Sequence, residues 1–226
     1  MKDLMVIRTE DLLHNPTNRV PIVLCLDVSY SMDGEPINEL NEGVRQFFQA
    51  LKNDPIASVS AEVAIIAFHS ESELILDFQA LERIDSVPIL EPKGMTDLGG
   101  GVLKSLACLN ERKNEYQAAG VEYFQPWLVL MTDGGPTTNT HQQAAADVCW
   151  MESAGKLTVF PIGIGDAAAM DVLTTFSQKK PPLRLKALNF QGFFEWLSQS
   201  VVRVSQSMPG EAVQIDTDGI QGWGEL

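Results

Sequence analysis

Residues 22–34 read IVLCLDVSYSMDG, and this stretch decides the fold that we expect for the chain. Five apolar residues lead into Asp27, and Ser29 and Ser31 follow at steps of two. The apolar run is typical of a strand that is buried on both faces, as in a parallel sheet. In an extended segment alternate side chains share a face, so Asp27, Ser29 and Ser31 can converge on one point.

The composition is that of one globular α/β domain. The chain has 226 residues, of which 45% are hydrophobic and 20% are charged, and it can bury most of its apolar surface. A formal net charge of -14 disfavours binding to nucleic acid or to an anionic membrane. Three cysteines without a Cys-x-x-Cys pair, and a charged N-terminus without a signal peptide or a membrane span, predict a cytoplasmic protein.

Apolar runs and helical periodicities alternate along the chain. Strands are expected at 20–26, 63–68, 127–131 and 157–164, with a weaker one at 183–187, and helices near 36–53, 97–112, 138–154, 168–176 and 193–207. Residues 74–78 can pair with 63–68 as an antiparallel hairpin. This order predicts an α/β fold with a Rossmann-like, doubly wound and mostly parallel sheet, one antiparallel edge strand, and helices on both faces.

The domain organisation is expected to be simple. Residues 1–207 are predicted to form a single domain with its core at about 19–207. Residues 208–226 read as a polar, glycine-rich tail that is loosely held, and Trp223 within it has no assigned role. Pro161 suggests a bend or an irregular edge in the strand 157–164.

Oxygen-bearing side chains recur where predicted strands end or a predicted helix begins. Besides Asp27, Ser29 and Ser31, they are Thr132 and Asp133 after the strand 127–131, and Thr96 and Asp97 at the start of the helix 97–112. Ligands of open α/β sheets bind outside the carboxyl ends of the strands, so these side chains are candidates for one site. Carboxylate and hydroxyl oxygens without His or Cys suit Mg²⁺ or Mn²⁺ better than zinc. Alternatively, Ser and Asp at such positions cap turns and helix starts.

The motif D-x-S-x-S at residues 27–31, followed in order by Thr96 and Asp133, resembles the metal-ion-dependent adhesion site (MIDAS) of von Willebrand factor A (VWA) domains. The likeness covers about residues 19–207. The segments VPIVLCLDVSYSMDGEPINELNEGV and VLMTDGGPT are similar to the TerY-like branch of intracellular bacterial members, which is linked to tellurium resistance. The resemblance implies a VWA fold and a MIDAS with the metal ligands Asp27, Ser29, Ser31, Thr96 and Asp133.

The resemblance also implies a function. Ser29, Ser31 and Thr96 would offer hydroxyl oxygens to Mg²⁺, with Mn²⁺ or Ca²⁺ as alternatives, while Asp27 and Asp133 would act mainly through bound waters. A vacant coordination position would take an Asp or Glu side chain of a partner protein, which makes the domain a protein-binding module and not an enzyme. The TerY-like branch implies a bacterial tellurite or stress response, with kinase-like or phosphatase-like proteins as partners.

Tyr30 within the motif and Asp97 next to Thr96 depart from the ligand set. Tyr30 stands where the family commonly has a small residue, often Gly, so its ring is expected to flank or partly shield the ion. Asp97 follows Thr96 and is expected either to act near the metal through a hydrogen bond or a water, or to cap the helix that begins there.

Two other functions stay open from the sequence. Gly165-Asp166 and Asp171 resemble the acidic metal loop of haloacid-dehalogenase-type phosphatases, in which Asp27 would be the nucleophile that accepts the phosphoryl group. Ser29 stands where that family has a second carboxylate as its general acid, which argues against a phosphatase. The other alternative is a metal-independent scaffold in which the oxygen cluster only caps turns.

Overall fold

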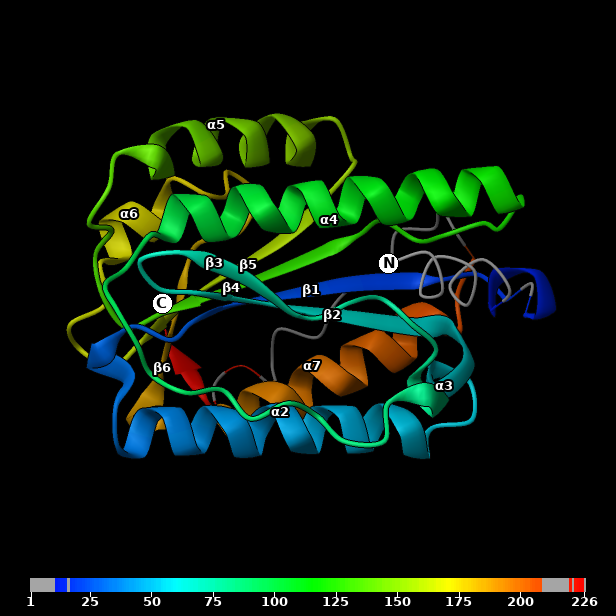
Figure 1. Cartoon of the computed structure of the whole chain (residues 1–226), viewed down its shortest axis with the longest axis horizontal. Helices are drawn as coiled ribbons and strands as arrows, with labels where there is room; N and C mark the ends of the chain where they lie inside the picture. The colour runs from blue at the N-terminus through cyan, green and yellow to red at the C-terminus, as the bar shows by residue number, and fades with distance from the viewer. Residues whose placement is uncertain (1–10, 16, 209–219, 221, 226) are drawn as a thin grey trace.

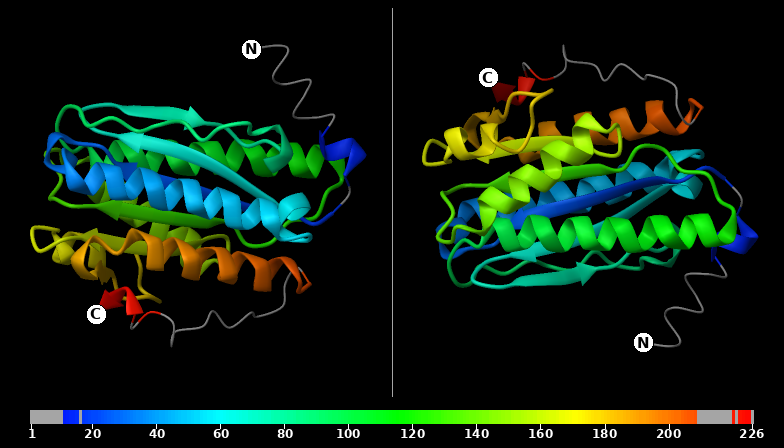
Figure 2. Two further views of the ribbon diagram at one scale, coloured as in Figure 1. Left: turned by 90° about the horizontal axis from the view of Figure 1, so that it is seen from below. Right: turned by 90° about the horizontal axis from the view of Figure 1, so that it is seen from above.

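The computed structural model describes residues 11–15, 17–208, 220 and 222–225. Within these residues, a seven-stranded sheet has the strand order β3-β2-β1-β4-β5-β6-β7 and lies between two layers of helices (Figures 1 and 2). Residues 1–10, on which the prediction of no signal peptide rests, and most of the predicted tail lie outside the described residues. The sheet has the mostly parallel α/β architecture that the alternating pattern predicts.

The parallel strands are β1 (Val20–Asp27), β2 (Ala61–Phe68), β4 (Trp127–Thr132), β5 (Thr158–Ile164) and β6 (Leu183–Leu185). The antiparallel strands β3 (Ser72–Leu76) and β7 (Gly224–Glu225) pair with β2 and β6. The helices are α2 (Glu35–Asn53), α3 (Ala57–Ser60), α4 (Leu98–Ala119), α5 (Thr140–Ser153), α6 (Met170–Thr174) and α7 (Phe190–Ser205), with 3₁₀ turns η1 (Tyr30–Met32), η2 (Leu81–Arg83) and η3 (Lys186–Leu188). Of the helices in the described part of the chain, none is long and apolar enough to cross a membrane.

Strand β1 fills both apolar layers of the core, as its sequence predicts. Ile22, Leu24 and Leu26 pack in the layer formed with α2 and α7. Val23 and Cys25 pack in the opposite layer, formed with α4 and α5. Figure 2 shows α2 and α7 on one face of the sheet and α4 and α5 on the other. Because every residue of β1 is buried, the strand lies at the centre of the molecule.

The end of the described chain is packed against the domain, unlike the loosely held tail that the sequence suggests. The Trp223 side chain is 2% exposed, and its ring centre lies 5.0 Å from that of Phe193 and 5.3 Å from that of Trp196. The Lys186 backbone N–H donates to the Trp223 carbonyl at 2.8 Å. Residues 222–225 therefore belong to the domain, and β7 adds a second antiparallel edge strand to the one predicted.

Strand β5 also differs from expectation. It continues through Pro161, which lies in the interior of the sheet opposite Leu130 of β4. The neighbouring strand β6 pairs only with residues 162–164 of β5, so Pro161 precedes that ladder.

Helix α4 extends seven residues beyond the predicted end at Arg112, to Ala119, where Gly120 adopts a left-handed backbone. The inner face of this last part is polar in sequence yet buried, because Arg112 and Tyr116 are both 0% exposed. Their partner is Glu62 of β2, which supplies the acceptor that the buried donors need. A search for apolar periodicity misses such a face.

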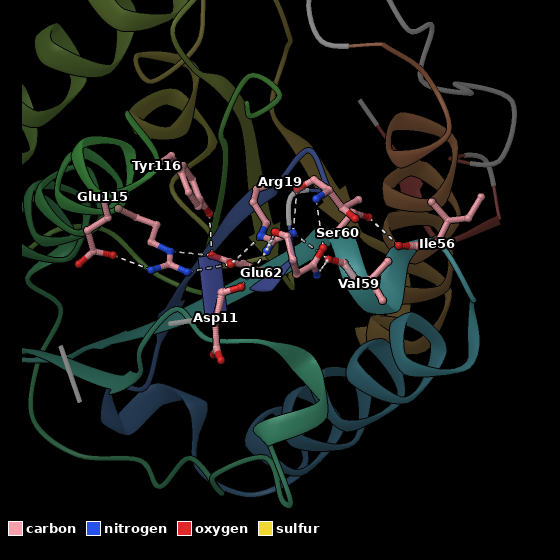
Figure 3. Close-up of polar contacts among 11 residues, drawn as sticks. Asp11, Arg19, Ile56, Val59, Ser60, Glu62, Glu115 and Tyr116 are labelled. Atoms are coloured by element: carbon pink, nitrogen blue, oxygen red, sulfur yellow. Dashed lines mark hydrogen bonds and ion pairs between the residues drawn. The ribbon is translucent and has the colours of Figure 1, made fainter. Parts of the chain in front are cut away.

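The carboxylate of Glu62 is the centre of a buried ion network at the end of the sheet where β1 and β2 begin (Figure 3). It accepts hydrogen bonds from Arg112 Nε at 2.7 Å, Arg112 Nη2 at 2.8 Å, Arg19 Nε at 3.1 Å and the Tyr116 hydroxyl at 2.6 Å. Arg19 Nη1 also donates to the Val59 carbonyl at 3.0 Å. The network joins the segment before β1 to β2 and α4.

Replacing Glu62 by Gln should destabilise the protein strongly, because two buried guanidinium groups would lose the charge that balances them. We expect the free energy of unfolding to fall by about 3–5 kcal/mol, measured by urea denaturation. Glu42→Gln is the matched control, since Glu42 pairs with Arg45 at 2.6 Å on the exposed surface of α2. Equal losses in the two variants would show that the buried network does not stabilise the fold.

Candidate metal centre

Asp27 is the last residue of β1, and its side chain is fully buried. Its Oδ1 accepts a hydrogen bond from the Ser29 backbone N–H at 2.8 Å, and its Oδ2 accepts one from the Thr132 hydroxyl at 2.5 Å. Thr132 ends the adjacent parallel strand β4, so the pairing of β1 with β4 brings these side chains to one edge of the sheet. The carboxylate is therefore fixed by neutral donors on both oxygens.

Ser29, Ser31 and Asp133 continue this set of oxygen atoms toward the surface. The Ser29 and Ser31 hydroxyls lie 3.0 Å apart, and the Ser31 hydroxyl donates to Asp133 Oδ1 at 2.8 Å. Ser29 is 2% exposed, whereas Ser31 is exposed. Hydrogen bonds thus connect four of the five residues of the motif in one series, from the buried Asp27 to the partly exposed Asp133.

Thr96 lies in the loop before α4 and is 7% exposed. Its carbonyl accepts hydrogen bonds from the backbone N–H and the hydroxyl of Thr137, each at 2.9 Å. Two residues earlier, the Gly94 carbonyl accepts the Tyr30 backbone N–H at 3.1 Å. The loop is therefore bonded to the turn that carries the serines and to the loop after β4. Among the described residues, no hydrogen bond joins the Thr96 hydroxyl to the other four side chains.

Asp97 caps α4, which is one of the two roles that the sequence left open. Its Oδ1 accepts hydrogen bonds from the Gly100 backbone N–H at 3.2 Å and from the hydroxyls of Thr138 and Thr140 at 2.7 and 2.8 Å. Partial burial opposes ionisation, but these three donors hold the pKa of Asp97 below its ordinary value. A Cβ at Gly99 would collide with the backbone of Thr140, so the glycine allows α4 to approach α5.

Burial disfavours the ionised form of both carboxylates of the site. Desolvation raises the pKa of Asp27 to about 6, against the hydrogen bonds from Ser29 and Thr132, and the nearby Asp133 adds to the increase. Desolvation also raises the pKa of Asp133, although the Ser31 hydroxyl opposes the change. A bound cation would reverse this tendency, because it favours the ionised form of both acids.

The donor set fits a hard divalent cation. It consists of carboxylate and hydroxyl oxygens, which Mg²⁺, Mn²⁺ and Ca²⁺ prefer. Among the residues that the structure describes, no group of three or more His, Cys, Asp or Glu side chains is placed to hold a metal ion. A metal at this edge would therefore need the serine and threonine hydroxyls as well as the two acids. The sequence placed Thr132 among the oxygen-bearing side chains of this edge but gave it no role in the ligand set; the structure shows that its hydroxyl bonds the buried Asp27 carboxylate.

The family assignment agrees with this arrangement. The model of the von Willebrand factor type A domain matches residues 22–193, and the chain belongs to this family. The matched range runs from β1 into the first turn of α7, so it contains all five residues of the motif. No curated protein matches the sequence.

Solved structures with a similar fold include three proteins with different contexts. Proximal thread matrix protein 1 from the mussel byssus, in a form with a zinc-occupied MIDAS motif, has a TM-score of 0.57 and 20% identity over 82% of this chain and 48% of its own. The pilus adhesin SpaC from Lactobacillus rhamnosus GG has a TM-score of 0.66 and 14% identity over 83% of this chain and 30% of its own. The vWF domain of the type V pili tip protein Mfa5 from Porphyromonas gingivalis has a TM-score of 0.58 and 14% identity over 87% of this chain and 99% of its own.

At these identities the similarity establishes the fold alone. This chain spans about half the length of the mussel protein and less than a third of the length of SpaC.

The raised pKa of Asp27 predicts how the metal-free protein responds to pH. Asp27 binds its proton more tightly in the folded than in the unfolded state, so its ionisation destabilises the fold as pH rises from about 4 through about 6. In chelator at pH 7, Asp27→Asn should raise the free energy of unfolding by up to about 3 kcal/mol, the equivalent of the change from 3.8 to about 6. The gain should nearly vanish at about pH 3.5 and below, where the native carboxyl is mostly protonated in both states.

Asp97→Asn is the control with the opposite sign. Because hydrogen bonds lower the pKa of Asp97, its ionised form stabilises the fold, and the amide should be less stable than the native protein at pH 7. Thermal or urea unfolding in chelator at several pH values measures both effects. A loss of stability in Asp27→Asn at pH 7 would contradict our description of the buried carboxylate.

Proposed function

We propose that this domain binds proteins through a divalent cation, most simply Mg²⁺, and that it is not an enzyme. The cation would be held by Asp27, Ser29, Ser31, Thr96 and Asp133. The observation that carries this proposal is the series of hydrogen bonds from Asp27 through Ser29 and Ser31 to Asp133 at the carboxyl edge of the central strands. The series reaches the surface, where a second protein has access to it.

The two kinds of oxygen ligand have different roles. Ser29, Ser31 and Thr96 offer neutral hydroxyl oxygens, and Asp27 and Asp133 balance the charge. The Asp27 oxygens already accept hydrogen bonds from Ser29 and Thr132, which suits an acid that acts through bound water. When bound, the cation supplies an electron-poor position that attracts the carboxylate of a partner's Asp or Glu. Mn²⁺ and Ca²⁺ are the alternatives to Mg²⁺, and the oxygen-only donors make zinc, found in the mussel protein, the poorer match here.

We extend the proposal to a biological context. The fold is shared with a pilus adhesin and a pilus tip protein, which agrees with a role in binding proteins. A cytoplasmic, bacterial tellurite or stress response with kinase-like or phosphatase-like partners rests on the TerY-like resemblance of the sequence alone.

Metal binding tests the proposal directly. In calorimetric titrations with MgCl₂, Asp27→Ala and the double variant Ser29→Ala/Ser31→Ala should lose binding while their circular dichroism stays native. Asp147→Ala is the matched control, because Asp147 is a partly exposed acid on α5 whose hydrogen bond among the described residues is with Gln143 of the same helix. Unchanged Mg²⁺ affinity in the site variants would refute the assignment of the ligands.

Two assays separate the alternative functions. A phosphatase would hydrolyse an aryl phosphate in Mg²⁺ and lose this activity in Asp27→Asn, and we expect no turnover in the native protein. A metal-independent scaffold would recover the same partner equally in Mg²⁺ and in EDTA, and we expect recovery only in Mg²⁺.

A further inference from the structure

Two large apolar side chains are exposed beside the candidate metal centre. The Tyr30 side chain is 69% exposed and lies between Ser29 and Ser31, and the Met95 side chain is 60% exposed and lies directly before Thr96. Both therefore adjoin residues of the proposed ligand set. Single exposed apolar residues are common on protein surfaces, but these two are sequence neighbours of three of the proposed ligands, Ser29, Ser31 and Thr96.

The backbone holds both residues in place although their side chains face solvent. The Tyr30 N–H donates to the Gly94 carbonyl at 3.1 Å, and the Met95 N–H donates to the Ser70 hydroxyl at 2.9 Å. The first of these bonds also joins the two segments to each other. The pair is thus presented on anchored turns, and binding a partner there costs less conformational entropy than ordering a free loop.

We infer that Tyr30 and Met95 form an apolar rim that selects partners in which an apolar side chain is next to the metal-bound Asp or Glu. This inference rests on the proposed function, because the acid is placed by the cation. Tyr and Met are enriched in the cores of protein interfaces, and aromatic residues are frequent hot spots there.

Charge restricts the partner further. Two exposed acids follow Tyr30 closely in the chain: Asp33 donates its backbone N–H to the Tyr30 carbonyl at 3.1 Å, and Glu35 begins α2. They would repel any further carboxylate on the partner. The rim therefore fits a segment with one acid, an adjacent apolar residue and otherwise neutral or basic side chains, and it disfavours an acidic run.

A displayed library of short random peptides with one fixed central Asp tests the inference. Panning against the native protein in MgCl₂ should enrich aromatic or aliphatic residues next to the Asp and deplete further acids. The same selection on Tyr30→Ser/Met95→Ser should lose the apolar enrichment, whereas Tyr30→Phe should keep it. Trp150→Ser is the matched control, since Trp150 is 62% exposed on α5 and its ring contacts Lys156, whose Nζ lies 4.8 Å from the ring centre.

Affinities of one enriched peptide give the size of the effect. We expect Tyr30→Ser/Met95→Ser to weaken its binding about ten-fold or more, while the Mg²⁺ affinity measured by calorimetry stays at the native value. Two results would contradict the apolar rim without contradicting the proposed function. One is that native selections require Mg²⁺ and the Asp but show no apolar preference; the other is that the double variant shows the same apolar preference as the native protein. Selections that depend on neither Mg²⁺ nor the fixed Asp would overturn both.

Discussion

The buried carboxylate of Asp27 is the group on which the arrangement of the site depends. It lies at the end of the central strand, beside β4, where solvent does not reach it. A buried carboxylate requires hydrogen-bond donors, and the turn after β1 and the end of β4 supply them through Ser29 and Thr132. These donors fix the path of the chain after the strand, which places Ser31 within reach of Asp133.

The sheet has a buried acid at each end, and the surrounding charges differ between the two. Glu62 faces two guanidinium groups and a tyrosine hydroxyl, so its charge is balanced within the chain. Asp27 receives hydrogen bonds only from neutral groups among the described residues, and its charged neighbour is a second acid, Asp133. At one end of the sheet, arginine side chains balance the negative charge of the buried Glu62. At the other end, no cationic side chain of the described residues bonds Asp27, which is consistent with a site for an external cation.

Much of the fold and the site could be predicted because the signals are local. The apolar run before Asp27 predicts a strand buried on both faces, and the two-residue steps after it predict that Ser29 and Ser31 share a face. The parts that were missed depend on contacts between distant segments. The length of α4 depends on Glu62, fifty residues from Arg112 in sequence, and apolar periodicity does not detect a polar buried face. The place of Trp223 depends on aromatic residues of α7, and a two-residue strand has no pattern of its own.

The central claim is that the oxygens at the carboxyl edge of β1 and β4 bind a divalent cation, and anomalous diffraction tests it most directly. Crystals grown with MnCl₂ should show one strong anomalous peak beside Ser29 and Ser31, with hydroxyl oxygens about 2.1 Å away and Asp27 and Asp133 within hydrogen-bonding distance of its waters. Crystals of Ser29→Ala/Ser31→Ala grown in the same way should lack the peak. Native crystals without a peak at this edge, or with manganese bound only elsewhere, would contradict the account.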